Sequence, residues 1–299
     1  MLCNPAVLPG VQAFSHRAMH TEFEILIQTP DARYAGEAAA AAFDTLDRLE
    51  HELSRFIETS DIARINQLQP GQRLPLSLDT FACLTQCQTL WQETSGAFDI
   101  TIGAALKTTR TPTTSQSLTQ RFETIQLHPE TVSLSLAGDS VCLDLGGIGK
   151  GYAADAMIVL LHEWDLDTVL VHGGGSTVFA KGPGLKNGWP LRLAHPSHPH
   201  QTLHRVSIQN RALSSSGLQK GAHILDPRTL APVGHHQAVW VQAPTATQAD
   251  ALSTAFMVLT QAEVQAYLAT HLEINAWILP MGGEELLPLP AESPLSPTN

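Results

Sequence analysis

The part of the sequence with the most chemical content is a glycine-rich run, Asp144-Leu-Gly-Gly-Ile-Gly-Lys-Gly-Tyr-Ala-Ala-Asp155. Its glycines allow an anionic ligand to approach the backbone closely, and the helical pattern that follows offers free N–H groups at its start. Lys150 adds a positive charge to the same turn. The run has neither the first Gly nor the Ser/Thr of a P-loop, and its G-x-G-x-G spacing differs from a Rossmann fingerprint. It indicates an anion-binding turn or, alternatively, tight packing of a helix on a sheet.

A second candidate lies in the segment Ala249-Asp-Ala-Leu-Ser-Thr254. Asp250 and Thr254 are four residues apart, so they share one face at the first turn of an expected helix. A carboxylate with a hydroxyl is a hard-oxygen pair that suits Mg²⁺, which keeps several waters and generally binds a substrate phosphate as well. The alternative is an acidic residue that merely favours the helix dipole. His223, just before the turn at Asp226-Pro227, is a candidate general base or a structural histidine.

Three other patterns are weaker candidates. Ser95-Gly-Ala-Phe-Asp99 combines a turn with an aromatic ring and a carboxylate. Ser214-Ser-Ser-Gly217 lacks the leading glycine of the serine-hydrolase motif G-x-S-x-G. The histidines at positions 195, 198, 200 and 204 alternate with prolines and have no Cys or acidic partner nearby, which is typical of a solvated loop.

Alternating and helical periodicities indicate the elements that position these residues. Strands are expected over residues 20–29, 132–136, 140–145, 168–172, 191–194, 203–208 and 276–279, the second and third paired around Gly138. Helices are expected over 32–56, from an N-cap at Asp79 to Thr94, from the glycine-rich turn to Trp164, and from starts near Ala249 and Ala262. Residues 107–121 and 182–190 are expected to be loops. Paired strands with separate long helices predict an α+β fold, with mixed and antiparallel sheets flanked by helices.

Composition limits the function further. The chain has 299 residues, of which 43% are hydrophobic, and this is enough to bury a core. Its 17 Lys and Arg against 28 Asp and Glu give a net charge of −11, which argues against binding of nucleic acid. No apolar run reaches the length of a membrane span, and the first ten residues have no early Lys or Arg and no apolar core, so no signal peptide is expected. A cytoplasmic protein is expected, or a periplasmic one if an upstream leader is missing.

Taken in order along the chain, these motifs resemble the family of ApbE-type FAD:protein FMN transferases. The matching segments are Met19-His-Thr21, Gly96-Ala-Phe-Asp99, Asp144 to Asp155, His172-Gly-Gly-Gly-Ser176, Ala222-His-Ile-Leu-Asp-Pro-Arg-Thr229 and Ala249 to Thr254. The resemblance implies one compact flavin transferase domain over residues 19–287. It would be preceded by an N-terminal extension over 1–18 and followed by a disordered tail over 288–299.

The resemblance also implies a reaction. Such an enzyme cleaves the pyrophosphate of FAD with Mg²⁺, or Mn²⁺ in its place, attaches FMN to a Thr or Ser of an acceptor protein, and releases AMP. The acceptor would carry a D-x-x-[ST]-[GS]-A-[ST]-like segment. His223 and Asp250 would be catalytic, with His223 taking the proton of the acceptor hydroxyl. Asp250, Ser253, Thr254 and the carbonyl of Gly147 would hold the cation. The residues implied to line the FAD site are Met19, Thr21, Phe56, Ala97, Phe98, Asp99, Asp144, Lys150 and Ile224.

The sequence departs from the family pattern at five positions. His20 and Leu230 replace glycines, His172 and Ser176 replace an Asn and an Asp, and Phe56 replaces the usual Tyr. Two alternatives therefore stay open. One is an FAD pyrophosphatase, in which water accepts the phosphoryl group to give FMN and AMP. The other is a flavin-binding protein without catalytic activity.

Overall fold

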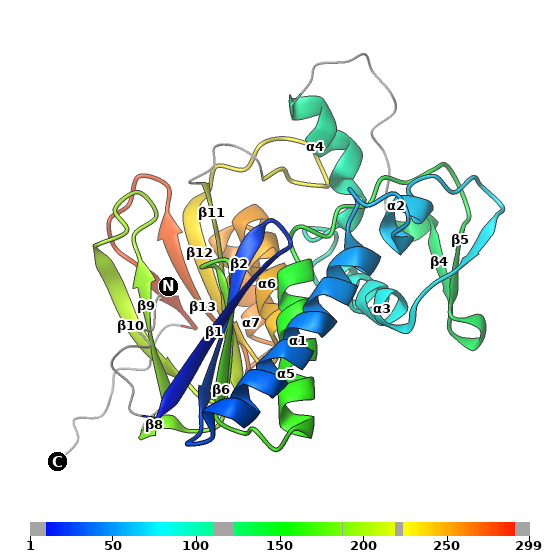
Figure 1. The fold of residues 1–299 in the computed structure, drawn as a ribbon. Coiled ribbons are helices and arrows are strands. Elements are labelled where there is room, and N and C mark those ends of the chain that lie inside the picture. Colours follow the sequence, from blue (N-terminus) through cyan, green and yellow to red (C-terminus); the bar gives the residue numbers. More distant parts are fainter. Residues whose placement is uncertain (1–9, 111–121, 187, 219–223, 291–299) are drawn as a thin grey trace.

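A central antiparallel sheet organises the protein, as the computed structural model in Figure 1 shows for residues 10–110, 122–186, 188–218 and 224–290. The strand order is β1-β2-β6-β7-β11-β12-β13-β14. These strands are β1 (Val11–Ala18), β2 (Thr21–Gln28), β6 (Val169–Gly173), β7 (Thr177–Lys181), β11 (Arg211–Gly217), β12 (His236–Ala243), β13 (Asn275–Pro280) and β14 (Leu287–Leu289). The α+β class predicted from the sequence is therefore confirmed.

The two faces of this sheet are covered by different layers (Figure 1). Helices cover one face, namely α1 (Ala32–Leu53), α5 (Gly149–Glu163), α6 (Ala246–Val258) and α7 (Gln261–Leu268). The other face packs on a small sheet of β8 (Gly184–Lys186), β9 (Gly188–Ala194) and β10 (Thr202–Ile208). To one side lie β3 (Arg73–Pro75), β4 (Ile125–His128) and β5 (Ser133–Leu136), with α2 (Asp61–Ile65), α3 (Leu78–Glu93), α4 (Gly103–Arg110) and the short turns η2 (Ile100–Ile102), η3 (Phe122–Thr124) and η4 (Pro129–Thr131).

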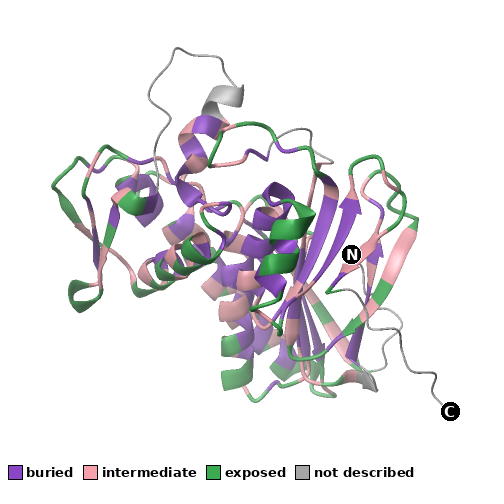
Figure 2. Ribbon diagram, turned by 180° about the vertical axis from the view of Figure 1, so that it is seen from behind, coloured by how far each residue is buried: buried purple, intermediate pink, exposed green. Residues whose placement is uncertain are grey.

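Two apolar clusters fill the space between these layers, and β2 contributes to both. Phe23, Ile25 and Ile27 alternate along the strand and join the cluster under the helices. Leu26 points the opposite way, into the cluster that contains Trp189 of β9. Successive strand side chains leave opposite faces of a sheet, so one strand can serve both layers. Figure 2 shows the result, with inner strands of the central sheet, such as β6 and β12, and α6 largely buried, whereas the edge strand β1 is mostly not.

Several helix boundaries differ from those expected, each for a local reason. The first helix ends at Leu53 and not at residue 56, because Ser54 is extended with ψ of 128°. The helix over 78–93 is capped by Ser77, whose hydroxyl accepts from Thr80 N–H, and not by Asp79. Residues 103–110 are helical, whereas the rest of the expected loop, 111–121, lies outside the described residues.

The strand expected over 140–145 does not form, because the hydrogen bonds of that segment go elsewhere. Leu143 N–H donates to the side chain of Asn66 at 2.6 Å, and Asp144 N–H donates to the carbonyl of Ile100 at 2.8 Å. The partners of β5 are instead β3 and β4. The expected loop over 182–190 contains β8 and the start of β9, and β7, β11 and β12 add strands that the sequence pattern did not indicate.

Residues near both expected domain boundaries take part in the central sheet. Val11–Ala18 forms β1, which pairs with β2 along its whole length, so residue 19 falls in the turn between two paired strands. Leu287–Leu289 forms β14 against β13. Within the described part of the chain, no helix combines the length and hydropathy that crossing a bilayer requires.

His172, one of the departures from the family pattern, makes stability depend on pH. It lies on β6 opposite Glu24 of β2, and its Nε2 is buried with no hydrogen-bond partner among the described residues. Burial lowers the pKa of His172 to about 4. In the unfolded chain the pKa of His172 is about 6.5, so the unfolded chain binds this proton more strongly. Stability is therefore lost as the pH falls from the unfolded pKa toward the folded one.

We expect His172→Gln to remove this contribution. The loss in free energy of unfolding between pH 7.5 and pH 5, measured by urea denaturation, should be about 2 kcal/mol smaller in the variant than in the unmodified protein. Burial raises the pKa of Glu24, and this acts in the opposite direction. Since Glu24 is present in both proteins, the comparison isolates His172. An identical pH dependence of the two proteins would contradict the assignment.

Candidate active site

Asp250 lies at the centre of the cluster that combines most of the expected chemistry. Its helix, α6, begins at Ala246 after the N-cap Thr245, three residues earlier than the sequence pattern suggested. Asp250 is therefore not in the first turn, and the helix dipole does not explain its position. The residue is only 3% exposed. A buried carboxylate requires compensation by hydrogen bonds or by an opposite charge.

Four donors surround the carboxylate of Asp250, and they come from three other elements. Its Oδ1 accepts from Thr177 Oγ1 of β7 and from Ser214 Oγ of β11, both at 3.0 Å. Its Oδ2 accepts from Gly151 N–H of α5 at 3.1 Å. Lys150 Nζ lies 3.3 and 3.4 Å from the two carboxylate oxygens and balances the charge. Lys150 and Asp250, expected to share one site, are thus direct partners.

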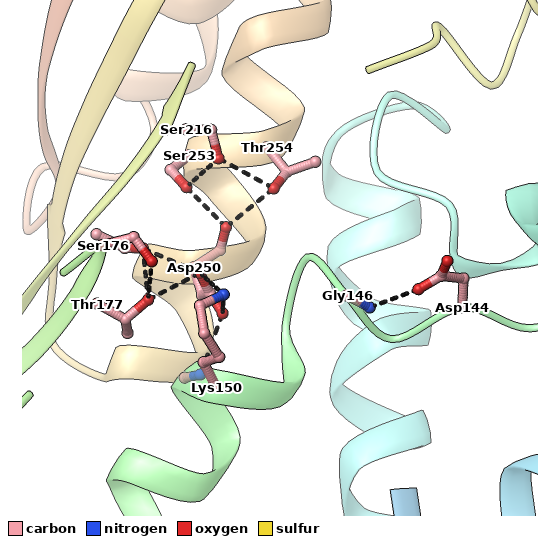
Figure 3. Close-up of polar contacts among 11 residues, drawn as sticks. Asp144, Gly146, Lys150, Ser176, Thr177, Ser216, Asp250, Ser253 and Thr254 are labelled. Atoms are coloured by element: carbon pink, nitrogen blue, oxygen red, sulfur yellow. Dashed lines mark hydrogen bonds and ion pairs between the residues drawn. The ribbon is translucent and has the colours of Figure 1, made fainter. Parts of the chain in front are cut away.

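A group of hydroxyls lies one turn further along α6 (Figure 3). Ser253 Oγ and Thr254 Oγ1 both donate to the backbone carbonyl of Asp250, at 2.9 and 3.4 Å. Ser216 Oγ of β11 lies 2.8 Å from Ser253 Oγ and 3.3 Å from Thr254 Oγ1. The structure therefore brings together the carboxylate and the two hydroxyls that the sequence assigned to a cation, and adds a third hydroxyl.

The glycine-rich turn packs directly against this group. A Cβ atom on Gly147 would lie 3.1 Å from Thr254 Oγ1 and 3.5 Å from a ring carbon of Phe98. Glycine at this position keeps the backbone turn in contact with the hydroxyl without a side chain between them. Gly147, Phe98 and Thr254, which the sequence predicted to belong to one site, are therefore neighbours.

Asp155, the last residue of the motif, fixes the helix that carries Asp250. Its carboxylate accepts from the N–H groups of Ala246 and Thr247, both at 2.8 Å, and from the Thr247 hydroxyl. It thus satisfies free N–H groups at the start of α6. Burial raises the pKa of Asp155. The sequence motif contained this residue but did not indicate that it caps a neighbouring helix.

We expect Asp155→Ala to lower the free energy of unfolding by about 2–3 kcal/mol, because it leaves several buried donors without an acceptor. Urea denaturation measures this effect. Asp167→Ala is a suitable control, since that carboxylate is 62% exposed and pairs only with His162 among the ion pairs of the described residues. It should change stability by less than about 1 kcal/mol. Equal effects of the two substitutions would contradict the capping role of Asp155.

Asp144 and Phe56 form a second group beside the turn. Asp144 Oδ1 accepts from Gly146 N–H at 2.8 Å, and its Oδ2 lies 3.2 Å from Arg55 Nη1. The guanidinium carbon of Arg55 lies 4.7 Å from the centre of the Phe56 ring. Phe56 is 66% exposed, and His20 meets its ring edge-on at 5.7 Å. An exposed aromatic ring with the Arg55 guanidinium on one of its faces provides a surface on which a planar ligand can stack.

Asp99, with Ala97 and Phe98, is buried next to η2. Its Oδ1 accepts from Thr101 N–H at 2.8 Å and from Thr101 Oγ1 at 2.7 Å, and its Oδ2 accepts from Phe122 N–H at 3.4 Å. Burial raises the pKa of Asp99. Both carboxylate oxygens therefore have partners within the chain, so the residue holds the turn around Phe98.

Two departures from the family pattern lie at backbone positions that favour glycine. Met19 and His20 have φ of 51° and 59° in the turn between β1 and β2, and Leu230 has φ of 61°. Residues other than glycine seldom adopt this left-handed region. Thr21 follows the first of these turns, and a Cβ atom on Gly174 would lie 2.5 Å from its Oγ1. Thr21 thus contacts the turn between β6 and β7. Thr177, which donates to Asp250, is the first residue of β7.

The remaining expected residues are His223 and Ile224. His223 lies outside the described residues, so its position relative to Asp250 is not part of the site described here. Ile224 is buried, and its carbonyl accepts from Val233 N–H at 3.1 Å. Ser176, another departure, lies 3.5 Å from Thr177 through their hydroxyl oxygens.

The groups at Asp250 that could be ligands of a cation fit a hard cation better than a soft one. They are a carboxylate, hydroxyls and a nearby backbone turn, which are oxygen ligands of the kind that Mg²⁺ prefers. Among the described residues there is no group of three or more His, Cys, Asp or Glu side chains that could hold a metal ion. A cation at Asp250 would therefore need further oxygen ligands, such as the phosphates of a bound nucleotide.

Sequence reasoning missed two contributors to this site, namely Arg55 and Thr177. It singled out Ser214 and Ser216 only as part of an incomplete serine-hydrolase pattern and did not connect them with Asp250, although their spacing places both on one face of a strand.

The chain is an α+β protein with an eight-stranded antiparallel sheet. Its candidate site is a glycine-rich turn that packs against a buried carboxylate and neighbouring hydroxyls. Residues 19–278 match the ApbE family, and the protein is a member of that family. It is 27% identical over 277 residues to the FAD:protein FMN transferase of Escherichia coli K12, which covers 83% of this chain and 78% of that protein.

Two further relatives show how widely the likeness extends. The chain is 29% identical over 308 residues to the FAD:protein FMN transferase of Treponema pallidum, with 85% of this chain and 83% of that protein covered. Its fold is similar to the crystal structure of Pseudomonas stutzeri flavinyl transferase ApbE in the apo form. That likeness has a TM-score of 0.81 at 23% identity and covers 93% of each chain.

Proposed function

We propose that this chain is an FAD:protein FMN transferase that depends on a divalent cation, with Mg²⁺ preferred on the chemistry of its donors. The observation that carries the proposal is the cluster of Asp250, Ser253 and Thr254 against the glycine-rich turn at Gly147. Family membership supports the same activity, since the curated relatives are named for it. The stacking surface at Phe56 suits an isoalloxazine or adenine ring.

In the proposed reaction, the hydroxyl oxygen of an acceptor Thr or Ser forms a bond to the FMN phosphorus of FAD. The bond from that phosphorus to the bridging oxygen breaks, and AMP leaves with that oxygen. His223 takes the proton of the acceptor hydroxyl, which is otherwise a weak nucleophile near neutral pH. The cation, when bound, stabilises the negative charge that develops on the transferred group and on AMP.

The other residues bind and orient FAD in this proposal. Asp250, Ser253, Thr254 and the Gly147 carbonyl would hold the cation. Lys150 stays close to the pyrophosphate, where its ammonium group adds positive charge. The remaining residues form the walls of the FAD site, and these are Met19, Thr21, Phe56, Ala97, Phe98, Asp99, Asp144 and Ile224.

The test is the release of AMP from FAD by the purified protein, with Mg²⁺ and with EDTA. Each condition is run with and without a peptide that carries the D-x-x-[ST]-[GS]-A-[ST] segment. We expect metal-dependent AMP release that rises with the peptide, and a peptide that becomes fluorescent. Equal AMP release without peptide would identify an FAD pyrophosphatase. Bound FAD without any AMP would overturn both catalytic functions and leave a flavin-binding protein.

A further inference from the structure

Ser216 has no role in the proposed reaction, yet it reaches the hydroxyls expected to bind the cation. It lies on β11, whose side chains alternate between two faces. Ala212 faces the helices and Leu213 faces β9 and β10, according to the clusters that they join. Ser214 and Ser216 share the face of Ala212, and both contact α6. Ser215, between them, belongs to the opposite face.

The direction of the hydrogen bonds shows what Ser216 does. Ser253 and Thr254 each use their single hydroxyl proton to donate to the carbonyl of Asp250. When both protons point to that carbonyl, the oxygens of Ser253 and Thr254 accept from Ser216 in the contacts at 2.8 and 3.3 Å. The Ser216 hydroxyl lies within hydrogen-bond distance of both oxygens, so it constrains the rotamers of both side chains.

This constraint matters because, in the part of the chain that the structure describes, Ser216 supplies the hydrogen bonds that reach these two hydroxyls from the sheet. The donation of Thr254 to the carbonyl is long, at 3.4 Å, and leaves its rotamer weakly determined. A cation requires ligand oxygens at closely defined positions, and groups that orient the ligands contribute strongly to affinity. The hydroxyl of Ser216 supplies such an orienting group from a second element.

We propose that Ser216 is a positioning residue of the cation site, which acts by holding Ser253 and Thr254 in the arrangement that binds the ion. The inference rests on the proposed function, because it requires a divalent cation at Asp250. It concerns the affinity for that cation and not the chemical step, so the effect of substitution should appear at limiting metal and fade at saturating metal.

The test measures the binding of Mn²⁺ to the full chain by electron paramagnetic resonance of the free ion, in the presence of FAD. We expect Ser216→Ala to raise the dissociation constant of Mn²⁺ about 10-fold or more, as loss of a ligand-orienting group typically does. Ser216→Thr keeps the hydroxyl, so its dissociation constant for Mn²⁺ should stay within roughly threefold of the value for the unmodified protein. This change is smaller than the one expected from loss of an orienting group. Ser215→Ala, on the other face of the same strand, is the matched control and should not change the affinity.

The outcomes separate this inference from the proposed function. If the unmodified protein binds no Mn²⁺, the proposed cation is overturned, and Ser216 with it. If the unmodified protein binds Mn²⁺ and Ser216→Ala binds it equally well, only the role of Ser216 is overturned. The same holds if Ser216→Thr is as weak as Ser216→Ala, because the hydroxyl would then not be responsible. Thermal melting without metal identifies any variant that fails to fold.

Discussion

Asp250→Asn should lower the rate of AMP release from FAD by about a thousandfold at saturating Mg²⁺, with a much smaller effect on the binding of FAD. Asn has the shape of Asp but lacks the negative charge that a divalent cation requires. Loss of one electrostatic group that acts on the developing charge typically lowers kcat by about 10²–10³-fold. The measurement is the initial rate of AMP formation, with the affinity for FAD obtained separately from flavin fluorescence.

The surroundings of Asp250 call for two controls. Asp167→Asn removes a carboxylate that is 62% exposed and pairs with His162, and it should leave the rate unchanged. Asp250→Asn also leaves the ammonium group of Lys150 beside a neutral amide, and this can destabilise the fold. The double variant with Lys150→Met removes that charge and should recover stability but not activity. A rate within tenfold of the unmodified enzyme would show that Asp250 does not hold the cation.

The fold class could be predicted from the sequence, and so could the two segments that the structure brings together at Asp250, because these depend on local patterns. The glycine-rich run and the spacing of Asp250 and Thr254 each lie within a dozen residues. The contact between them depends on helix packing, which Gly147 and Gly151 allow. That contact was inferred only from the resemblance to a family, since no local pattern encodes the distance between two segments a hundred residues apart.

Contacts from the sheet were not predictable in this way. Thr177 and Ser214 hold Asp250 from strands that the periodicity did not indicate. The strand with Ser214 has polar residues on both faces at its end, so apolar alternation does not identify it. The segment over 140–145 gave the opposite error. It alternates as a strand does, but its N–H groups bond to Asn66 and to η2, a competition that only the tertiary structure determines.

Tertiary structure also explains how His20 and Leu230 can replace the glycines of the family pattern. His20 and Leu230 are unfavourable residues for a left-handed backbone, at roughly 1–2 kcal/mol each. The turns nevertheless form, because the strands and the Asp226 turn on either side fix their ends. Leu230 N–H, for example, donates to the carbonyl of Asp226 at 2.6 Å. A motif comparison records the changed residue type, whereas the conformation that it must adopt is visible only in the folded chain.

Gly151→Ala should be the most damaging small substitution in the glycine-rich run. A Cβ atom at this position would lie 2.2 Å from the carbonyl oxygen of Ala246 and 2.9 Å from Cβ of Asp250. Neither atom belongs to a flexible side chain, so α5 and α6 must move apart. Overpacking of this kind costs about 3 kcal/mol, which outweighs the gain of at most about 1 kcal/mol from placing alanine in a helix. Urea denaturation should show this loss.

The same run contains its own control, because Gly149 lies two residues earlier at the start of the same helix. A Cβ atom on Gly149 would meet no atom within 4 Å. Gly149→Ala should therefore leave stability unchanged or raise it by up to about 1 kcal/mol. Moving α5 away also breaks the donation from Gly151 N–H to Asp250, so Gly151→Ala should weaken the binding of Mn²⁺ as well. If both alanine variants were equally stable, the close approach of α5 to α6 would not be what positions Asp250.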